Sequence, residues 1–511
     1  MNYFRILLSL LLLSPFFLLA QDNAYFNYCG TVPGLNLPFI DAFHARPEKF
    51  PARSSDTLWM GVQLHLLADD NGSGRVSGER ILDAFCQLNK DYEPSQIRFL
   101  FKQEWNQINN AKWFMHDSLK TGVEMMLTSN VADAFNTYFV SNPAGNAGYN
   151  LPYAGVALKN SEASLNNHTW THEIGHALAL EHTFIGWEGK KYDPNLPTPD
   201  TVTYNYTYFH DTLDTTIPAP DDIALVEYVD GSNCGIAADR ICDSKPDYLS
   251  YPWECNAQGM STVQQKDPAG AAFRSDGSLY MSYAADNCQN RFSPEQIQIM
   301  RAYLLNQKAA WIVADPQIPV IADLPQLESP ANNQTVPANA VHMQWQPTPG
   351  ATHYLVQISR LNSFAIKEQE IVVTDTFAVA APLLVNKTYY WRVRPFNEHY
   401  TCSAYTAPKS FVTVNATGVQ DAAAEGWRCY PTLLAPGSRI TLEISDAWLN
   451  QTSLFRVYDT AGRLRWESSI VLRGKRIELT PPVNEWSAGM YYLVCSGKPG
   501  VLRHPVLVVA N

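Results

Sequence analysis

Residues 171 to 182 read THEIGHALALEH, which is the most informative motif of the chain. On a helix, His172 and His176 lie one turn apart on the same face, so both imidazoles can bind one metal ion. His182 follows six residues later and offers a third nitrogen. Three neutral imidazoles leave the fourth position of a zinc ion open for water, which is typical of a catalytic site. Glu173 is adjacent to the first ligand, where it can take a proton from that water.

The third histidine distinguishes this motif from those of other zinc hydrolases. It resembles the metzincin pattern His-Glu-x-x-His-x-x-Gly-x-x-His, in which the glycine ends the helix and turns the chain toward the metal. Ala179 occupies the glycine position here. We predict that Ala179 is left-handed, at a cost of about 1 kcal/mol that metal binding offsets.

A second motif narrows the resemblance. Residues 280 to 298 read YMSYAADNCQNRFSPEQIQ, which is similar to the Met-turn of pappalysin-type metzincins, including the cytophagalysin-like members from Bacteroidetes. The resemblance implies that Met281 packs beneath the zinc and that Tyr283 hydrogen-bonds the oxyanion of the transition state. Residues 88–92 (LNKDY) also match a family motif, and the resemblance covers about residues 57 to 310.

Residues 239 to 246 (DRICDSKP) resemble a family loop near which some members bind calcium. The resemblance implies that Asp239 and Asp243 offer oxygen ligands to Ca²⁺. Alternatively, both aspartates form turns or caps, which is the more common use of aspartate in a loop.

The chain contains nine cysteines, and an exported protein is expected to form disulfides. Cys234, Cys242, Cys255 and Cys288 are predicted to form two bridges. The sequence allows all three pairings of these four residues. The family resemblance favours 234–255 and 242–288.

Cys29 is the most informative of the remaining cysteines. A thiolate donated to the open zinc position would displace the catalytic water and keep the enzyme latent, as in the cysteine switch known among metzincins. The alternatives are a disulfide with Cys86 and a reactive thiol in an N-terminal tail. If Cys29 is a switch, residues 21–55 form a short propeptide, with Arg46 or Arg53 as plausible removal sites.

The N-terminus predicts export. Residues 1–20 combine an early Arg5 with an apolar run and resemble a secretory signal peptide cut before Gln21. No other segment is apolar enough for a membrane helix, so the mature chain is expected to have no transmembrane segment. The net charge of −12 and the pI near 5.5 argue against nucleic-acid binding.

Residues 56–312 are predicted to form a pappalysin-like α/β zinc-protease domain. Residues 56–67 alternate like a strand, and Ser77 is a predicted N-cap for a helix that follows it. We expect residues 153–158 to form an edge strand along the cleft, where extended substrate adds as a further strand.

Two all-β sandwich domains are predicted after a linker at residues 313–325. Residues 326–415 resemble a fibronectin type III domain, in which Trp345 and Trp391 are expected to be packing residues and not a carbohydrate platform. Residues 418–511 resemble the C-terminal sorting domain of the type IX secretion pathway. This resemblance implies export through the periplasm and outer membrane, to the cell surface or beyond.

These features predict a secreted zinc endopeptidase that hydrolyses internal peptide bonds of proteins, with Glu173 as general base and acid. Three alternatives remain open. The first is a zinc peptidase whose third ligand is a distant glutamate. The second is a catalytically inactive, metal-stabilised adhesin or binding protein, and the third is a carbohydrate-directed surface protein.

Overall fold

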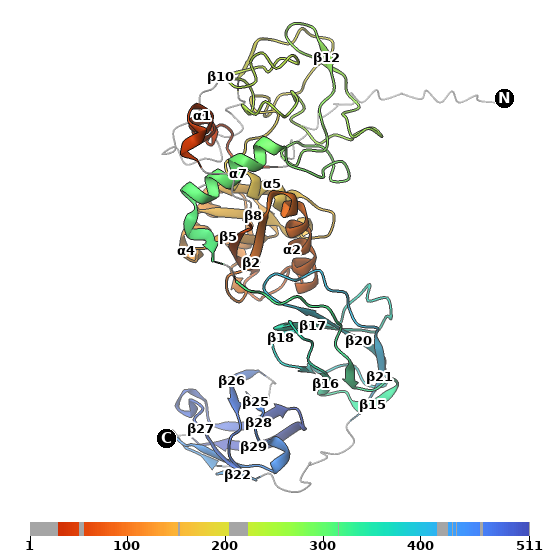
Figure 1. Ribbon diagram of the computed structural model, residues 1–511. Coiled ribbons are helices and arrows are strands. Elements are labelled where there is room, and N and C mark those ends of the chain that lie inside the picture. Colours follow the sequence, from red (N-terminus) through yellow and green to blue (C-terminus); the bar gives the residue numbers. More distant parts are fainter. Residues whose placement is uncertain are drawn as a thin grey trace, which may run out of the picture.

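The computed structural model describes residues 29–50, 56–151, 154–203, 223–314, 316–415, 428–431, 433–435, 437–459 and 463–509. The predicted signal peptide, part of the predicted propeptide and Arg53 lie outside these ranges. The described residues form an α/β domain followed by two β-sandwiches (Figure 1). Within the described ranges, no helix is both long and apolar enough to cross a membrane.

The α/β domain is built on a seven-stranded sheet of order β13-β1-β5-β8-β7, with β2 and β3 also paired to β1. The strands are β1 (Leu58–Ala68), β2 (Ile97–Phe101), β3 (Asn106–Asn109), β5 (Phe135–Val140), β7 (Gly148–Leu151), β8 (Gly155–Lys159) and β13 (Ile312–Val313). β1, β5 and β8 run parallel, whereas β7 is antiparallel to β8. Ten of the eleven residues of β1 are buried, as expected for a parallel strand covered on both faces.

The edge strand differs from the prediction. The predicted edge, residues 153–158, largely corresponds to β8, which pairs with β5 on one side and β7 on the other; residue 153 itself lies outside the described residues. The prediction was wrong because the apolar run of β8 is the pattern of an interior strand. The edge strand is β7, whose GYNL sequence carries a weaker β-strand signal.

Helices cover both faces of this sheet. α2 (Gly78–Tyr92), α5 (Thr169–Ala177) and α7 (Pro294–Gln307) share the larger core with one face, and α4 (Leu119–Ser129) packs on the other. The Ser77 side chain accepts a hydrogen bond from the backbone of Arg80, which confirms the predicted N-cap of α2. The smaller helix α3 (Ala111–Phe114) and the short pair β4 (Met115–His116) and β6 (Asn142–Pro143) complete this side of the domain.

The region between α5 and α7 contains little regular structure in its described part, namely β9 (Thr201–Thr203), β10 (Ile223–Leu225), β11 (Gln265–Lys266) and β12 (Ala272–Phe273). Two disulfides hold it together, Cys234–Cys242 and Cys255–Cys288. The pairing that the family resemblance favoured is therefore wrong. The chain on either side explains the observed pairing, because Trp253 and Ala284 form a parallel bridge that brings Cys255 next to Cys288.

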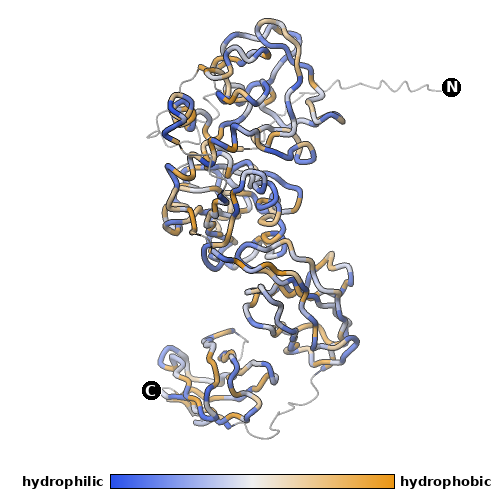
Figure 2. The backbone as a smooth tube through the Cα atoms, viewed as in Figure 1, coloured by the Kyte–Doolittle hydropathy of each residue, from blue (hydrophilic) through white to orange (hydrophobic). Residues whose placement is uncertain are grey.

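Both β-sandwiches consist of a three-stranded and a five-stranded sheet. The first contains β14 (Leu327–Ser329), β15 (Gln334–Pro337), β16 (Val341–Trp345), β17 (His353–Ser359), β18 (Gln369–Val373), β19 (Phe377–Ala380), β20 (Thr388–Phe396) and β21 (Lys409–Val414). The second contains β22 (Arg428–Tyr430), β23 (Leu433–Leu434), β24 (Ile440–Glu443), β25 (Thr452–Asp459), β26 (Leu464–Val471), β27 (Arg476–Leu479), β28 (Gly489–Gly497) and β29 (Gly500–Val508). Hydrophobic and hydrophilic residues are interspersed along the chain of both sandwiches (Figure 2). Trp345 and Trp391 are buried in the first core, so they are packing residues as predicted and present no surface for a glycan.

The first sandwich is joined to the α/β domain by a disulfide between Cys86 of α2 and Cys402. This bridge excludes the alternative that Cys86 pairs with Cys29.

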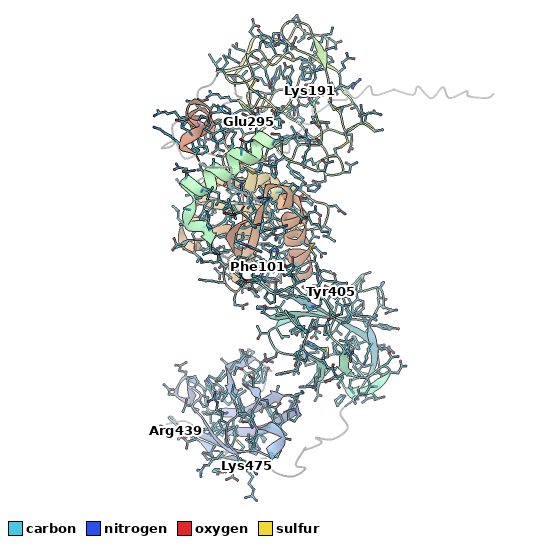
Figure 3. All side chains as sticks on the ribbon, in the orientation of Figure 1. Phe101, Lys191, Glu295, Tyr405, Arg439 and Lys475 are labelled. Atoms are coloured by element: carbon cyan, nitrogen blue, oxygen red, sulfur yellow. A yellow bond between two sulfur atoms is a disulfide. The ribbon has the colours of Figure 1, made fainter. Side chains whose placement is uncertain are left out.

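Further contacts join the two domains beside this bridge. Glu370 of the sandwich accepts hydrogen bonds from the backbone N–H groups of Gly78 (2.5 Å) and Glu79 (3.3 Å), at the N-terminus of α2. Phe101 and Tyr405 lie at the same junction (Figure 3), and Tyr405 packs against the core that contains Phe101.

Removing this bridge is expected to destabilise the two joined domains. The double variant Cys86→Ala/Cys402→Ala opens a connection of 316 residues, so unfolding should become easier by up to about 6 kcal/mol. Calorimetry of the full chain measures this loss. The matched control is Cys234→Ala/Cys242→Ala, which opens only 8 residues and should cost about 2 kcal/mol. An equal loss in both variants would mean that the long connection adds no stability of its own.

Candidate metal centre

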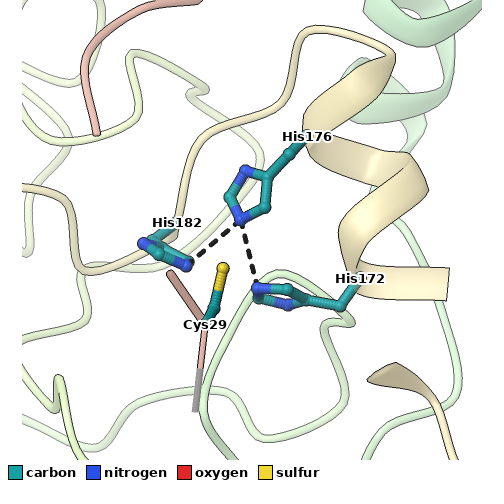
Figure 4. Close-up of side chains that lie close together, drawn as sticks. All are labelled: Cys29, His172, His176 and His182. Atoms are coloured by element: carbon teal, nitrogen blue, oxygen red, sulfur yellow. Dashed lines mark hydrogen bonds between the residues drawn. The ribbon is translucent and has the colours of Figure 1, made fainter. Parts of the chain in front are cut away.

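Three histidines converge at the C-terminal end of α5. His172 and His176 lie one turn apart on this helix, which ends at Ala177. Ala179 has φ of 73°, which confirms the predicted left-handed conformation and turns the chain back toward the helix. His182 thereby places its Nε2 atom 3.2 Å from Nε2 of His176, and Nε2 of His172 lies 3.1 Å from the same atom (Figure 4).

Each imidazole is held by a hydrogen bond from its other nitrogen. The acceptors are the carbonyl of Tyr280 for His172 (2.7 Å), the carbonyl of Leu180 for His176 (2.9 Å) and Oε1 of Glu188 for His182 (3.2 Å). The two carbonyl oxygens can only accept, so Nδ1 carries the proton in His172 and His176, and their Nε2 atoms present lone pairs; the same holds for His182 when Glu188 is ionised. Three lone pairs directed at one another repel unless a cation lies between them. The residues therefore fit a zinc ion held by three nitrogen ligands.

Burial keeps these imidazoles neutral. It lowers the pKa of His172 and that of His182 to about 3, with the charge of His182 adding to the effect at His172. Burial and the same neighbours also hold the pKa of His176 well below its usual value. Neutral imidazole is the form that binds a metal, so the site is ready for one at neutral pH.

Glu173 points from α5 to the edge strand β7. Its Oε2 atom accepts hydrogen bonds from Thr31 Oγ1 (3.0 Å) and Cys29 Sγ (3.5 Å), while its buried Oε1 has no hydrogen-bond partner. Burial raises the pKa of Glu173 to about 8, although the bonds from Cys29 and Thr31 oppose this rise. A carboxyl group with a pKa near neutrality is well suited to take up and return a proton.

Met281 and Tyr283 approach the histidines from the loop before α7. Met281 is fully buried beneath α5, so close that a Cβ atom added to Gly175 would lie 2.4 Å from its sulfur. The ring of Tyr283 lies 5.1 Å from that of His182. Its hydroxyl contacts the backbone N–H (3.2 Å) and carbonyl (3.4 Å) of Cys29. The loop thus brings a phenol next to the histidine cluster.

Cys29 lies among the three histidines. The ligand atoms of these four residues are all within 4.8 Å of one another, and the four side chains are buried. Cys29 forms a parallel bridge with Gly148 of β7, and the N–H of Gly30 donates to the carbonyl of Gly148 (2.9 Å). Burial, followed by the nearby Glu173, raises the pKa of the Cys29 thiol. The N-terminal segment therefore occupies both the candidate metal site and the free edge of the sheet.

The segment after Cys29 is anchored to the C-terminal end of α5. The buried Glu181 accepts hydrogen bonds from the N–H groups of Gly34 (3.0 Å) and Asn36 (2.7 Å). The Asn36 side chain donates to the carbonyls of His176 (3.1 Å) and Leu180 (3.0 Å), at the C-terminal end of α5. Helix α1 (Leu37–Ala45) follows directly and buries Ile40 and Phe43 in the main core of the domain.

Two buried glutamates were missed by the sequence analysis. Glu188 orients the His182 ring, and Glu181 binds the N-terminal segment. Burial raises the pKa of each to about 8. The position of Glu181 inside the motif, directly before His182, was the only local signal, because glutamates are otherwise common on exposed surfaces.

The two candidate calcium ligands are both engaged in hydrogen bonds within the protein. Asp243 accepts a hydrogen bond from the N–H of Glu295 in the first turn of α7 (2.8 Å). Asp239 accepts bonds from the N–H of Ile241 (3.1 Å) and the Ser244 hydroxyl (3.3 Å). These contacts match the alternative of turn and cap formation. In the described part of the chain, the group of metal-binding side chains in mutual reach is that of Cys29 and the three histidines.

Curated relatives of the chain are extracellular metalloproteases from fungi. Those of Arthroderma benhamiae and Trichophyton verrucosum are each 24% identical over 296 residues, covering 53% of this chain and 82% of the relative. That of Pyricularia oryzae is 28% identical over 155 residues, covering 26% of this chain and 54% of the relative. No protein-family model matches the chain.

Solved structures with detectable similarity include the FN1–FN3 domains of chicken CNTN1, at 11% identity, covering 37% of this chain and 68% of that one. Fibronectin(III)-like modules of Clostridium thermocellum CbhA match at 8% identity, covering 37% of this chain and 94% of that one. Both TM-scores are 0.15, too low to establish a shared fold. The sequence relatives and the histidine cluster together support a secreted metalloprotease.

Proposed function

We propose that the chain is a secreted zinc endopeptidase of the metzincin type, similar to the pappalysins, that hydrolyses internal peptide bonds of extracellular proteins. The observation that carries the proposal is the convergence of three oriented Nε2 atoms beside Glu173 of the same helix. His172, His176 and His182 would hold the zinc ion, which would polarise the scissile carbonyl and acidify the attacking water. The fungal relatives support the assignment of the chain as a metalloprotease, without specifying its type.

Three side chains of the site have proposed roles beside the metal ion. Glu173 takes a proton from the attacking water and returns it to the leaving amine. Tyr283, whose hydroxyl contacts the Cys29 backbone in this structure, donates to the oxyanion when a substrate replaces that segment. Met281 supports the helix from below and binds no ligand.

The edge strand β7 is the proposed substrate-binding edge. An extended peptide adds to such an edge by main-chain hydrogen bonds, while its side chains alternate between the two faces. The parallel bridge between Cys29 and Gly148 supports this role, because the N-terminal segment there pairs with β7 through its main chain.

The same proposal makes residues 29–36 a latency segment. Cys29 reaches the position that water needs, Thr31 engages the general base, and Gly34 and Asn36 attach the segment to Glu181. Zinc would reverse the preference of the buried thiol for its neutral form, since thiols that coordinate zinc are deprotonated. The exposed Arg46 remains a candidate for proteolytic removal of the segment.

Export through the type IX pathway is also part of the proposal. It depends on the resemblance of residues 418–511 to a sorting domain, and the β-sandwich formed by the described residues of this region is compatible with it. Calcium remains a prediction from resemblance, to which the hydrogen bonds of Asp239 and Asp243 add no support.

His182→Ala separates this proposal from a zinc peptidase with a distant third ligand. We expect zinc affinity to fall by more than about a hundredfold, which exceeds the loss caused by replacing a residue that only orients a ligand. Competition of the full chain with a chromophoric chelator measures it. His353→Ala, which changes a histidine of the first sandwich, should leave zinc affinity unchanged. Retention of zinc by His182→Ala would favour the distant-ligand peptidase.

The function itself is tested by incubating the exported chain with an unfolded protein and identifying every fragment by mass spectrometry. Cleavage between internal residues, lost on chelation of zinc, supports the endopeptidase. A chain that binds one zinc ion yet cleaves nothing, even after removal of residues 21–45, would support the inactive binding protein instead.

A further inference from the structure

Asp91 lies at the C-terminal end of α2 and is almost completely buried. Its Oδ2 atom accepts hydrogen bonds from Thr171 Oγ1 (2.6 Å) and His168 Nδ1 (2.7 Å). Its Oδ1 atom accepts bonds from Gln87 Nε2 (2.7 Å) and the Tyr280 hydroxyl (3.1 Å). One carboxylate thus holds four donors. A carboxylate is stable in the protein interior only when hydrogen-bond donors occupy its lone pairs.

These donors come from the elements that carry the metal site. Thr171 directly precedes His172 on α5, and His168 lies at the N-terminus of the same helix. Tyr280 directly precedes Met281, and its carbonyl accepts the hydrogen bond from His172 Nδ1. Asp91 therefore fixes His172 from two directions, through the residue before it in the chain and through the residue whose carbonyl orients its ring.

The neighbouring Tyr92 adds to the same arrangement. Its hydroxyl donates to the carbonyl of Thr171 (3.0 Å), and its ring packs against Phe292 at 4.9 Å. The end of α2 therefore binds both the side chain and the backbone of the residue before His172. Residues 88–92 matched a family motif, but their sequence alone assigned no role to any of them.

We propose that Asp91 is a positioning residue for the metal centre, which holds α5 and the Tyr280 loop in the relative position at which His172 can bind zinc. This inference rests on the proposed zinc site. Asp91 does not contact the metal or the substrate. It acts through Thr171 and Tyr280, so its loss should change the metal affinity of the site and the turnover of the bound substrate more than substrate binding.

Asp91→Asn tests the proposal with little change in size. The amide nitrogen can only donate, so it cannot accept from the two donors on its side of the carboxylate, and those partners must reorient or lose their hydrogen bonds. We expect the zinc affinity of the full chain to fall about tenfold or more, measured by competition with a chromophoric chelator. We also expect kcat to fall by at least a similar factor with KM within about twofold, measured on a peptide that the wild-type chain cleaves.

One further variant, Tyr280→Phe, keeps the test decisive if Asp91→Asn folds poorly. Tyr280→Phe removes only one of the four donors and should lower zinc affinity by a smaller factor, about threefold. In the double variant Asp91→Asn/Tyr280→Phe, the two losses should be less than additive, because both variants act on one interaction.

The matched control is Asp83→Asn, the same substitution on the same helix. Asp83 binds Arg394 of the first sandwich (2.7 Å), so its loss should lower the thermal stability of the metal-free chain without changing zinc affinity. Unchanged zinc affinity in both Asp91→Asn and Tyr280→Phe would overturn the proposal and leave Asp91 as a residue of general stability. If the wild-type chain cleaves nothing, the proposed endopeptidase fails, whereas the zinc measurement still decides the role of Asp91.

Discussion

Replacement of Glu173 by alanine is expected to abolish peptide hydrolysis while leaving one zinc ion bound per chain. Glu173 is the carboxylate beside the candidate metal site, and loss of a general base typically lowers turnover by about 10² to 10⁴-fold. The three imidazoles keep their orienting partners in this variant, since Tyr280, Leu180 and Glu188 are untouched. The measurement is turnover of a quenched fluorescent peptide, beside zinc content by mass spectrometry.

The comparison is best made in a Cys29→Ala background, so that latency does not mask the loss. Glu124→Ala is the control, because Glu124 is an exposed residue of α4 that pairs with Lys112. It should keep full activity. If Glu173→Ala turns over substrate at the rate of this control, another group must be the base.

The second large effect concerns Cys29. Its sulfur lies within reach of all three histidine nitrogens, where it can take the ligand position that water needs. A segment that occupies the site 99% of the time lowers activity about a hundredfold, so Cys29→Ala should raise the turnover of the unprocessed chain by up to about that factor. The measurement is the initial rate of the uncut chain, with gel electrophoresis to verify that it stays uncut.

Cys495→Ala is the matched control, since Cys495 is a buried free thiol in the second sandwich and should not affect the rate. A Cys29→Ala chain as inactive as the wild type would show that the thiol is not what blocks the site. The hydrogen bond from Thr31 to Glu173 would then be the next contact to remove.

The sequence predicted the features that depend on local chemistry. The spacing within residues 171–182 predicted which histidines share a helix face, and the glycine position of the motif predicted the left-handed Ala179. Ser77 was predicted as a cap because a hydroxyl before an amphipathic run has few other uses. In each case the decisive neighbours lie within a few residues along the chain.

The features that were missed or wrong depend on distant pairing. The bridge between Cys86 and Cys402 joins residues 316 positions apart, and nothing near either cysteine indicates its partner. The edge strand was misassigned because a strand's place in a sheet depends on its neighbours and not on its own pattern. Glu188 and Asp91 likewise gain their roles only when the folded chain brings them to the histidine rings and their supporting loop.

The packing of helix α1 bears on what a proteolytic cut after it would achieve. Ile40 lies in the main core, and Asn36 is bound to the end of α5, whereas residues 46–49 are exposed. A cut in that exposed stretch removes none of the contacts that hold residues 29–45. If residues 29–45 block the site as proposed, the severed piece would become a separate inhibitor molecule with its own dissociation constant, and the fraction of open sites would depend on total protein concentration. Activation by a single cut would then be reversible by mass action and would become complete only on dilution.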